Sequence, residues 1–153
     1  MAVGSQDGDT RVALLSRALR ESGLRLTHQR LEVVREIAGS REHPGAEDVY
    51  RAVRERVPTI SMDTVYRTLG TLSDLGLVRR VAVTRGPARY DANTTRHHHF
   101  VCTHCGLVRD VDDRRLDAVR APRSTASLGR VESIEVQMRG ICVDCTREGE
   151  RHD

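Results

Sequence analysis

The four cysteines of the chain form two pairs, each with two residues between its members. The pairs are Cys102 with Cys105 and Cys142 with Cys145, and 36 residues separate them. Two such pairs can complete the tetrahedral four-sulfur shell that suits zinc, and a closed shell predicts a structural zinc site. The alternatives are two disulfides, which the lack of a signal peptide disfavours, or a redox-active pair. His104 lies inside the first pair and is expected beside the site or at the surface rather than as a ligand.

Histidines and aspartates provide a second group of potential ligands near the first cysteine pair. His97 and His99 alternate on a predicted strand, so their side chains leave the same face, whereas His98 leaves the other. Asp110 lies near the end of the next predicted strand, and Asp91 ends an earlier one. Nitrogen and oxygen ligands of this kind suit Fe²⁺, Mn²⁺ or Zn²⁺ better than Cu⁺. A solvent-exposed histidine run with adventitious metal affinity is the alternative interpretation.

The elements that precede these residues have the order of a winged helix-turn-helix. Apolar residues recur at helical spacing after Thr10, and further helices are predicted to begin after Thr27, at Ala46 and after Ser61. Two short strands on either side of a turn at residues 84–87 then complete the pattern.

The helix predicted after Ser61 has the composition of a DNA-recognition helix. Its inward face would be Val65, Leu69 and Leu72, and its outward face Thr64, Tyr66, Arg67 and Thr71. Arginine can bridge guanine acceptors and tyrosine can pack on thymine methyl groups, so Tyr66 and Arg67 are candidates for reading bases. Arg25 is a candidate for a minor-groove or phosphate contact. An ordinary four-helix scaffold with solvated arginine and tyrosine side chains is the alternative.

The second part of the chain alternates short strands with one short helix. Strands are predicted at His99–Cys102, at Leu107–Asp110 and around Val131–Met138, with a helix from about Asp113 that Pro122 limits. We therefore predict an α+β protein with a winged-helix DNA-binding domain and a small α/β dimerisation domain. The predicted boundaries are a disordered leader at 1–9, the DNA-binding domain at 10–91, a hinge at 92–96 and the dimerisation and metal-binding domain at 97–153.

The composition restricts the class of protein. The chain has no tryptophan, one phenylalanine and three tyrosines, so its cores must be aliphatic. No apolar run approaches the roughly 18 residues of a membrane span, and we expect a soluble, cytoplasmic protein. The formal net charge is +3 and the first part of the chain is the more basic one, which weakly favours nucleic acid as a partner.

Several segments, considered together, carry a family resemblance between about Arg17 and Cys145. They are Gly23–Arg30, His43–Tyr50, Ser61–Leu69, Leu75–Val78, Ala88–Asp91 and His97–Cys102, together with both cysteine pairs. This set resembles the ferric uptake regulator (Fur) family of metal-dependent repressors. The resemblance implies a homodimer that binds an inverted-repeat operator in double-stranded DNA and carries a regulatory metal, Fe²⁺ or Mn²⁺, at the hinge between its domains.

The resemblance also implies a set of regulatory ligands. They would be His43, Asp91, His97, His99 and Asp110. His43 enters this set only through the resemblance. Because His43 lies in the DNA-binding half and the last three lie in the other half, a bound metal would stabilise one relative orientation of the two halves.

Asp110 makes the chain more similar to the peroxide-sensing branch of the family, because the iron-sensing branch usually has Glu at this position. In the peroxide-sensing branch, Fe²⁺ reacts with hydrogen peroxide and a ligating histidine is oxidised. The matching residues here are His43 and His97, and their oxidation would release DNA. The alternatives are an iron- or zinc-responsive repressor, a non-haem iron enzyme, and a zinc-stabilised interaction module that does not bind DNA. We expect no enzymatic activity.

The chain departs from the family pattern at a further metal site that many members carry in the dimerisation domain. The aligned positions are Arg96, His98, Asp117 and Ile134. An arginine and an isoleucine cannot build that ligand shell, so we expect two metals per subunit, one structural and one regulatory.

Overall fold

The computed structural model describes residues 4–150, with side chains for residues 8–149. The chain divides into two compact units, each of which is described by itself. The first unit contains the described residues up to Ala82 together with Pro87–Thr94, and the second contains Val83–Gly86 and the residues from Thr95 onward. Val83–Gly86, which connect the two strands of the hairpin in the first unit, therefore belong to the second unit.

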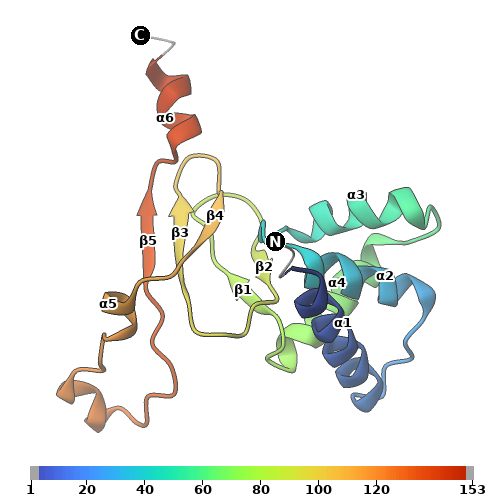
Figure 1. The fold of residues 1–153 in the computed structure, drawn as a ribbon, viewed down its shortest axis with the longest axis horizontal. Helices are drawn as coiled ribbons and strands as arrows, with labels where there is room; N and C mark the ends of the chain where they lie inside the picture. The colour runs from blue at the N-terminus through green and yellow to red at the C-terminus, as the bar shows by residue number, and fades with distance from the viewer. Residues whose placement is uncertain (1–3, 151–153) are drawn as a thin grey trace. The chain divides into compact units, whose positions relative to one another are not determined.

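The first unit consists of four helices followed by a two-stranded antiparallel hairpin (Figure 1). The elements are α1 (Gly4–Glu21), α2 (His28–Gly39), α3 (Ala46–Arg56), α4 (Met62–Asp74), β1 (Arg79–Val81) and β2 (Arg89–Asp91). This order confirms the winged-helix arrangement predicted for the first part of the chain.

Capping side chains explain where three of these helices begin. The Thr27 hydroxyl accepts a hydrogen bond from the backbone N–H of Arg30, and the Ser61 hydroxyl accepts one from Thr64. At α3 the Asp48 carboxylate accepts from the backbone N–H of Gly45 instead. Each bond satisfies one of the donors that a helix leaves unpaired at its start, so the predicted helix starts are confirmed.

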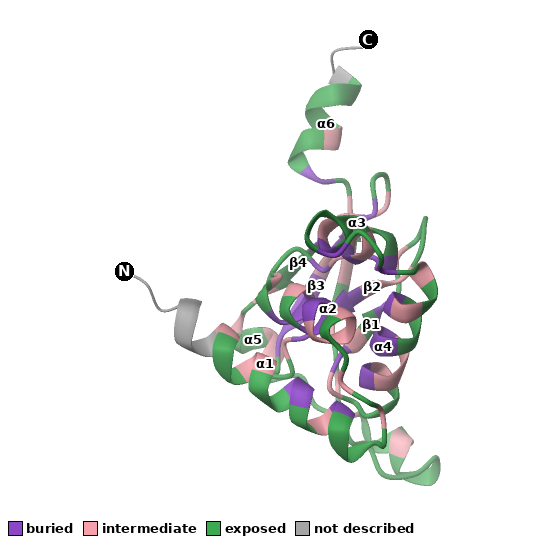
Figure 2. Ribbon diagram, turned by 90° about the vertical axis from the view of Figure 1, so that its right-hand side faces the viewer, coloured by how far each residue is buried: buried purple, intermediate pink, exposed green. Residues whose placement is uncertain are grey.

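The core of the first unit is aliphatic, as the composition predicted. Val65, Leu69 and Leu72 of α4 are fully buried and pack with residues of α1, α2 and α3. Figure 2 shows buried residues along α2 and α4 and exposed ones on α6. Thr68 is also fully buried. Its polar hydroxyl is tolerated there because it donates a hydrogen bond to the Thr64 carbonyl at 2.7 Å.

The start of α1 differs from the prediction. Residues 4–9 were predicted to be part of a disordered leader, whereas α1 already includes them. This segment has no proline, so its backbone can continue the helix. Residues 1–3 of the predicted leader lie outside the described residues.

The second unit contains a three-stranded sheet in the order β4-β3-β5 (Figure 1). The strands are β3 (His98–Cys102), β4 (Val108–Val111) and β5 (Gln137–Gly140). β4 pairs antiparallel to β3 with His99 opposite Asp110, and β5 pairs parallel to β3 with Cys102 opposite Gly140. The first register places His99 beside Asp110, and the second brings Cys102 close to Cys142 along the chain.

The remaining elements of the second unit are short. They are α5 (Arg114–Asp117), the 3-10 helix η1 (Arg123–Ser127) and α6 (Val143–Glu150). α5 begins at its N-cap Asp113, as predicted, but forms a single turn that ends at Asp117, five residues before Pro122. No helix in the described part of the chain is long and apolar enough to cross a membrane.

One prediction for the end of the chain was wrong. The strand predicted around Val131–Met138 is restricted to Gln137–Gly140, because only that stretch lies beside β3. α6 then runs from Val143, inside the second cysteine pair, to Glu150.

Candidate metal centres and DNA-binding surface

The four cysteines form one cluster at the ends of β3 and β5. Parallel pairing of these strands brings Cys102 beside Gly140, and Cys142 follows two residues later. The Sγ atoms of Cys102 and Cys145 are 4.0 Å apart, and those of Cys105 and Cys142 are 3.7 Å apart. Sulfur atoms at about 2.3 Å from one tetrahedral zinc ion lie roughly 3.8 Å apart, so the cluster fits zinc. All four residues are free thiols in this structure, and their sulfur atoms lie together as one group, as a shared metal site requires.

The electrostatics of this cluster favour a bound cation. Burial raises the pKa of the Cys102 thiol, but backbone N–H groups, including those of Cys105 and Cys142, outweigh burial and lower it to about 6. The neighbouring thiol of Cys145 has a raised pKa, because it hydrogen bonds to Cys142 and is desolvated next to other sulfur atoms. Four thiolates can therefore coexist here only when a cation such as Zn²⁺ compensates their charge.

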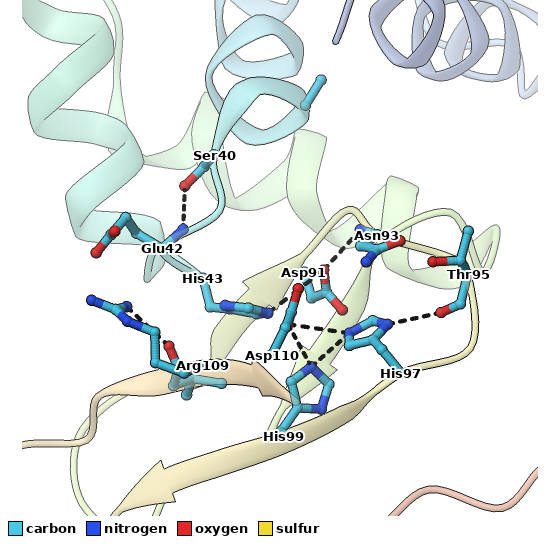
Figure 3. Close-up of polar contacts among 12 residues, drawn as sticks. Ser40, Glu42, His43, Asp91, Asn93, Thr95, His97, His99, Arg109 and Asp110 are labelled. Atoms are coloured by element: carbon cyan, nitrogen blue, oxygen red, sulfur yellow. Dashed lines mark hydrogen bonds and ion pairs between the residues drawn. The ribbon is translucent and has the colours of Figure 1, made fainter. Parts of the chain in front are cut away.

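Three potential ligands of the second unit converge near the start of β3. His97 Nε2 lies 2.9 Å from His99 Nε2, and the Asp110 carboxylate Oδ1 lies 3.4 Å from the former and 3.6 Å from the latter (Figure 3). Ligand atoms at about 2.1 Å from a shared ion lie roughly 3.0 Å apart at right angles and roughly 3.4 Å apart at the tetrahedral angle. The three atoms therefore fit the first coordination shell of a divalent ion.

Hydrogen bonding selects the ring nitrogen that His97 can offer to this ion. A carbonyl oxygen only accepts, so the 2.8 Å contact of His97 Nδ1 with the Thr95 carbonyl requires Nδ1 to carry the proton. The lone pair of neutral His97 is then on Nε2, which points toward His99. Such a partner behind a ligating histidine is the usual way in which proteins orient a metal-binding ring.

The first unit contributes a separate pair, His43 and Asp91, and both side chains are buried. His43 Nε2 lies 3.7 Å from Asp91 Oδ1, which also accepts the backbone N–H of Asn93 at 2.7 Å. His43 is the one non-glycine residue with a positive φ, +49°, among those described. Spacing along the sequence gave no signal for His43, because it is far from the other candidate ligands in the chain and only a family resemblance could identify it.

His98 points away from these ligands and is held by other partners. Its Nδ1 accepts the backbone N–H of Val136 at 3.2 Å, so its Nε2 carries the proton and faces the Asp117 carboxylate at 3.2 Å. The guanidinium of Arg96 also lies 3.7 Å from this carboxylate. His98 thus has no free lone pair in this arrangement.

The candidate DNA contacts lie on two segments of the first unit. Tyr66 and Arg67 are exposed on α4, while Thr64 is half-buried against the cap of the helix. Arg25 is exposed in the loop before α2, and its carbonyl accepts from Arg30 at 2.6 Å. Arg67 forms an ion pair with Asp63 at 2.9 Å, with both side chains 70% exposed. Sequence reasoning missed this pair, although its spacing of four residues on a helix signals it.

Comparison with known proteins identifies the class. The profile described as "Ferric uptake regulator family" matches residues 21–139, and the chain belongs to this family. Members of the family are metal-dependent transcriptional regulators that bind DNA and dimerise and are not enzymes.

Individual relatives span most of the chain. The "Peroxide-responsive repressor PerR" of Staphylococcus epidermidis is 32% identical over 132 residues, which cover 86% of this chain and 88% of that protein. The solved structure of PerR from Streptococcus pyogenes has a TM-score of 0.50 at 29% identity and covers 88% of this chain and 92% of its own. The ferric uptake regulator of Helicobacter pylori has a TM-score of 0.73, with 91% and 93% covered, and at 23% identity it shows the fold alone.

Proposed function

We propose that this Fur-family regulator is a homodimeric repressor that binds an operator when metal is bound and releases it when peroxide oxidises a ligating histidine. Zn²⁺ would be held by the four cysteines and would stabilise the second unit. The convergence of His97, His99 and Asp110 carries the proposal, because their ligand atoms lie within 3.6 Å of one another, at distances that a shared divalent ion would require. Because it would act on the chromosome, we expect it in the cytoplasm.

We infer that the regulatory ion takes ligands from both units. The second unit offers His97, His99 and Asp110, which leaves a six-coordinate ion incomplete, and the first unit offers His43 with Asp91. Five nitrogen and oxygen ligands suit Fe²⁺ or Mn²⁺. An ion bound by both sets is bound most tightly in the arrangements that bring them together, so metal would shift the population toward one orientation of the DNA-binding units.

Peroxide sensing is supported by Asp110 and by the similarity to peroxide-responsive repressors. Bound Fe²⁺ would supply the redox chemistry. In the net reaction one oxygen atom of hydrogen peroxide is inserted into a ring C–H bond of His43 or His97, and the other leaves as water. The oxidised ring is a poorer ligand, so the two ligand sets separate and DNA is released. The Thr95 carbonyl holds the His97 ring in place for this reaction.

For DNA, we propose that α4 enters the major groove, with Tyr66 and Arg67 reading bases and Thr64 and Arg25 supporting the contact. Exposure of Tyr66 and Arg67 supports these roles. The dimer would present two such helices to the halves of an inverted repeat.

Operator binding after peroxide treatment tests this function. DNA fragments are first selected from a random pool with Mn²⁺-loaded protein, and their binding is then followed by fluorescence anisotropy. We expect the Fe²⁺-loaded protein to lose DNA after a brief peroxide pulse and the Mn²⁺-loaded protein to retain it. Retention of DNA by both forms would support an iron- or zinc-responsive repressor instead. Lack of metal-dependent binding to any fragment would contradict both.

A further inference from the structure

The ligand pair of the first unit is built on an unusually short stretch of sheet. Gly45 forms an isolated antiparallel bridge with Arg89, and the Tyr90 N–H donates to the Pro44 carbonyl at 2.9 Å. Two residues outward from this bridge, the antiparallel register brings His43 opposite Asp91. A slip of one residue would turn Asp91 to the other face of the strand, so the register decides whether this pair can bind an ion.

This bridge has little backbone support of its own. It consists of one bridge pair beside a three-residue strand, and such short pairings are marginal in water. His43 also has a φ of +49°, which is unfavourable for a residue with a Cβ atom. Side chains must therefore hold the segment in register.

The carboxylate of Asp48 connects both strands of the bridge. Its Oδ2 accepts the backbone N–H of Gly45 at 2.9 Å and an N–H of the Arg89 guanidinium at 2.6 Å. The Asp48 and Arg89 side chains are only 38% and 26% exposed, so solvent screens this pair less than a fully exposed one. Arg51 contacts the other oxygen, Oδ1, but its side chain is 74% exposed and belongs to neither strand.

We infer that Asp48 and Arg89 are positioning residues that hold His43 opposite Asp91 and thereby set the affinity of the proposed regulatory site for its ion. This inference rests on the proposed function, because it assigns a role toward the ion that His43 and Asp91 would bind. Neither residue contacts the ion. They act through the bridge between Gly45 and Arg89.

The chain offers a matched pair of substitutions for a test. Arg89→Ala removes the contact that spans the bridge, whereas Arg51→Ala removes an arginine from the same carboxylate without touching the bridge. Mn²⁺ affinity is measured on the zinc-loaded full chain from the electron paramagnetic resonance signal of free Mn²⁺. Exchange of the Tyr90 amide proton reports whether the bridge opens, and Asp91→Ala reports whether the ion uses this ligand pair.

We expect Arg89→Ala to bind Mn²⁺ about 10- to 100-fold more weakly, the range for loss of a group that supports a ligand. Exchange at Tyr90 should accelerate, Arg89→Lys should recover most of the affinity, and Arg51→Ala should bind as the unmodified protein does. Equal Mn²⁺ affinities for Arg89→Ala and the unmodified protein would overturn the inference, and so would equal losses in both arginine variants. If Asp91→Ala also bound Mn²⁺ normally, the proposed site itself would be wrong.

Discussion

Substitution of Asp110 by alanine is the most direct perturbation of the second unit's ligand set. Its Oδ1 is one of three converging ligand atoms, at 3.4 Å and 3.6 Å from the Nε2 atoms of His97 and His99. Loss of a group that only supports a ligand costs about 10- to 100-fold in metal affinity. Loss of a charged ligand itself should lower the Mn²⁺ affinity at least about 100-fold, which corresponds to about 2.7 kcal/mol of binding free energy.

The same substitution should change the stability of the metal-free fold very little. The Asp110 side chain is 32% exposed at the end of an edge strand, and surface substitutions typically change stability by less than about 0.5 kcal/mol. The assay is a Mn²⁺ titration of zinc-loaded protein, with zinc content and thermal unfolding measured in parallel. Asp110→Glu is the matched variant, which we expect to bind Mn²⁺ but to be oxidised by peroxide more slowly when Fe²⁺ is bound.

Two results would refute this reasoning. Mn²⁺ affinity within threefold of the unmodified protein would show that Asp110 is not a ligand. Loss of zinc together with a lower unfolding temperature would show that Asp110 supports the fold of the sheet instead.

Three further predictions concern the zinc cluster, the helix packing and DNA. Cys102→Ser should prevent folding of the second unit, because a structural zinc site contributes roughly 10 kcal/mol or more, and circular dichroism with zinc analysis measures this. Burial raises the pKa of Glu32, but hydrogen bonds from Arg35 and Arg56 outweigh burial and hold it below its ordinary value of 4.5. Glu32→Gln should therefore lose about 1–3 kcal/mol in urea unfolding at pH 7, and its difference from the unmodified protein should shrink as the pH falls below that value. Arg67→Ala should relax operator specificity by about 1–3 kcal/mol at one base pair, measured by repeating the selection of DNA fragments.

Each of these predictions can fail in its own way. A Cys102→Ser protein with normal ellipticity would show that the second unit folds without its zinc site. A constant stability difference for Glu32→Gln between pH 7 and pH 3 would show that the charge of the carboxylate is irrelevant. An unchanged fragment preference for Arg67→Ala would assign that side chain to phosphates or to solvent.

The sequence allowed α2, α3 and α4 of the first unit to be predicted closely, because local signals determine where they begin. Thr27 and Ser61 cap helices where polar residues precede apolar repeats, and Val65, Leu69 and Leu72 follow the helical period. The end of the chain was predicted poorly. There the extent of β5 depends on which residues lie beside β3, and this pairing leaves no signal in the local pattern.

The candidate sites divide in the same way. Local spacing was sufficient for the cysteine pairs and for His97 with His99, since alternation on one strand determines which side chains share a face. The role of Asp48 could not be predicted, because its contact with Arg89 joins residues 41 positions apart. The burial of Glu32 depends likewise on Arg56 of a different helix.

The central claim is that peroxide oxidises a ligating histidine, and peptide mass measurement of Fe²⁺-loaded protein after a brief peroxide pulse tests it most directly. We predict one added oxygen atom on the peptide that contains His43 or on the one that contains His97, in proportion to the loss of operator binding. The exposed His28 and His104 serve as internal controls and should remain unmodified. Loss of operator binding with both candidate histidines intact, or equal oxidation of the controls, would contradict the account.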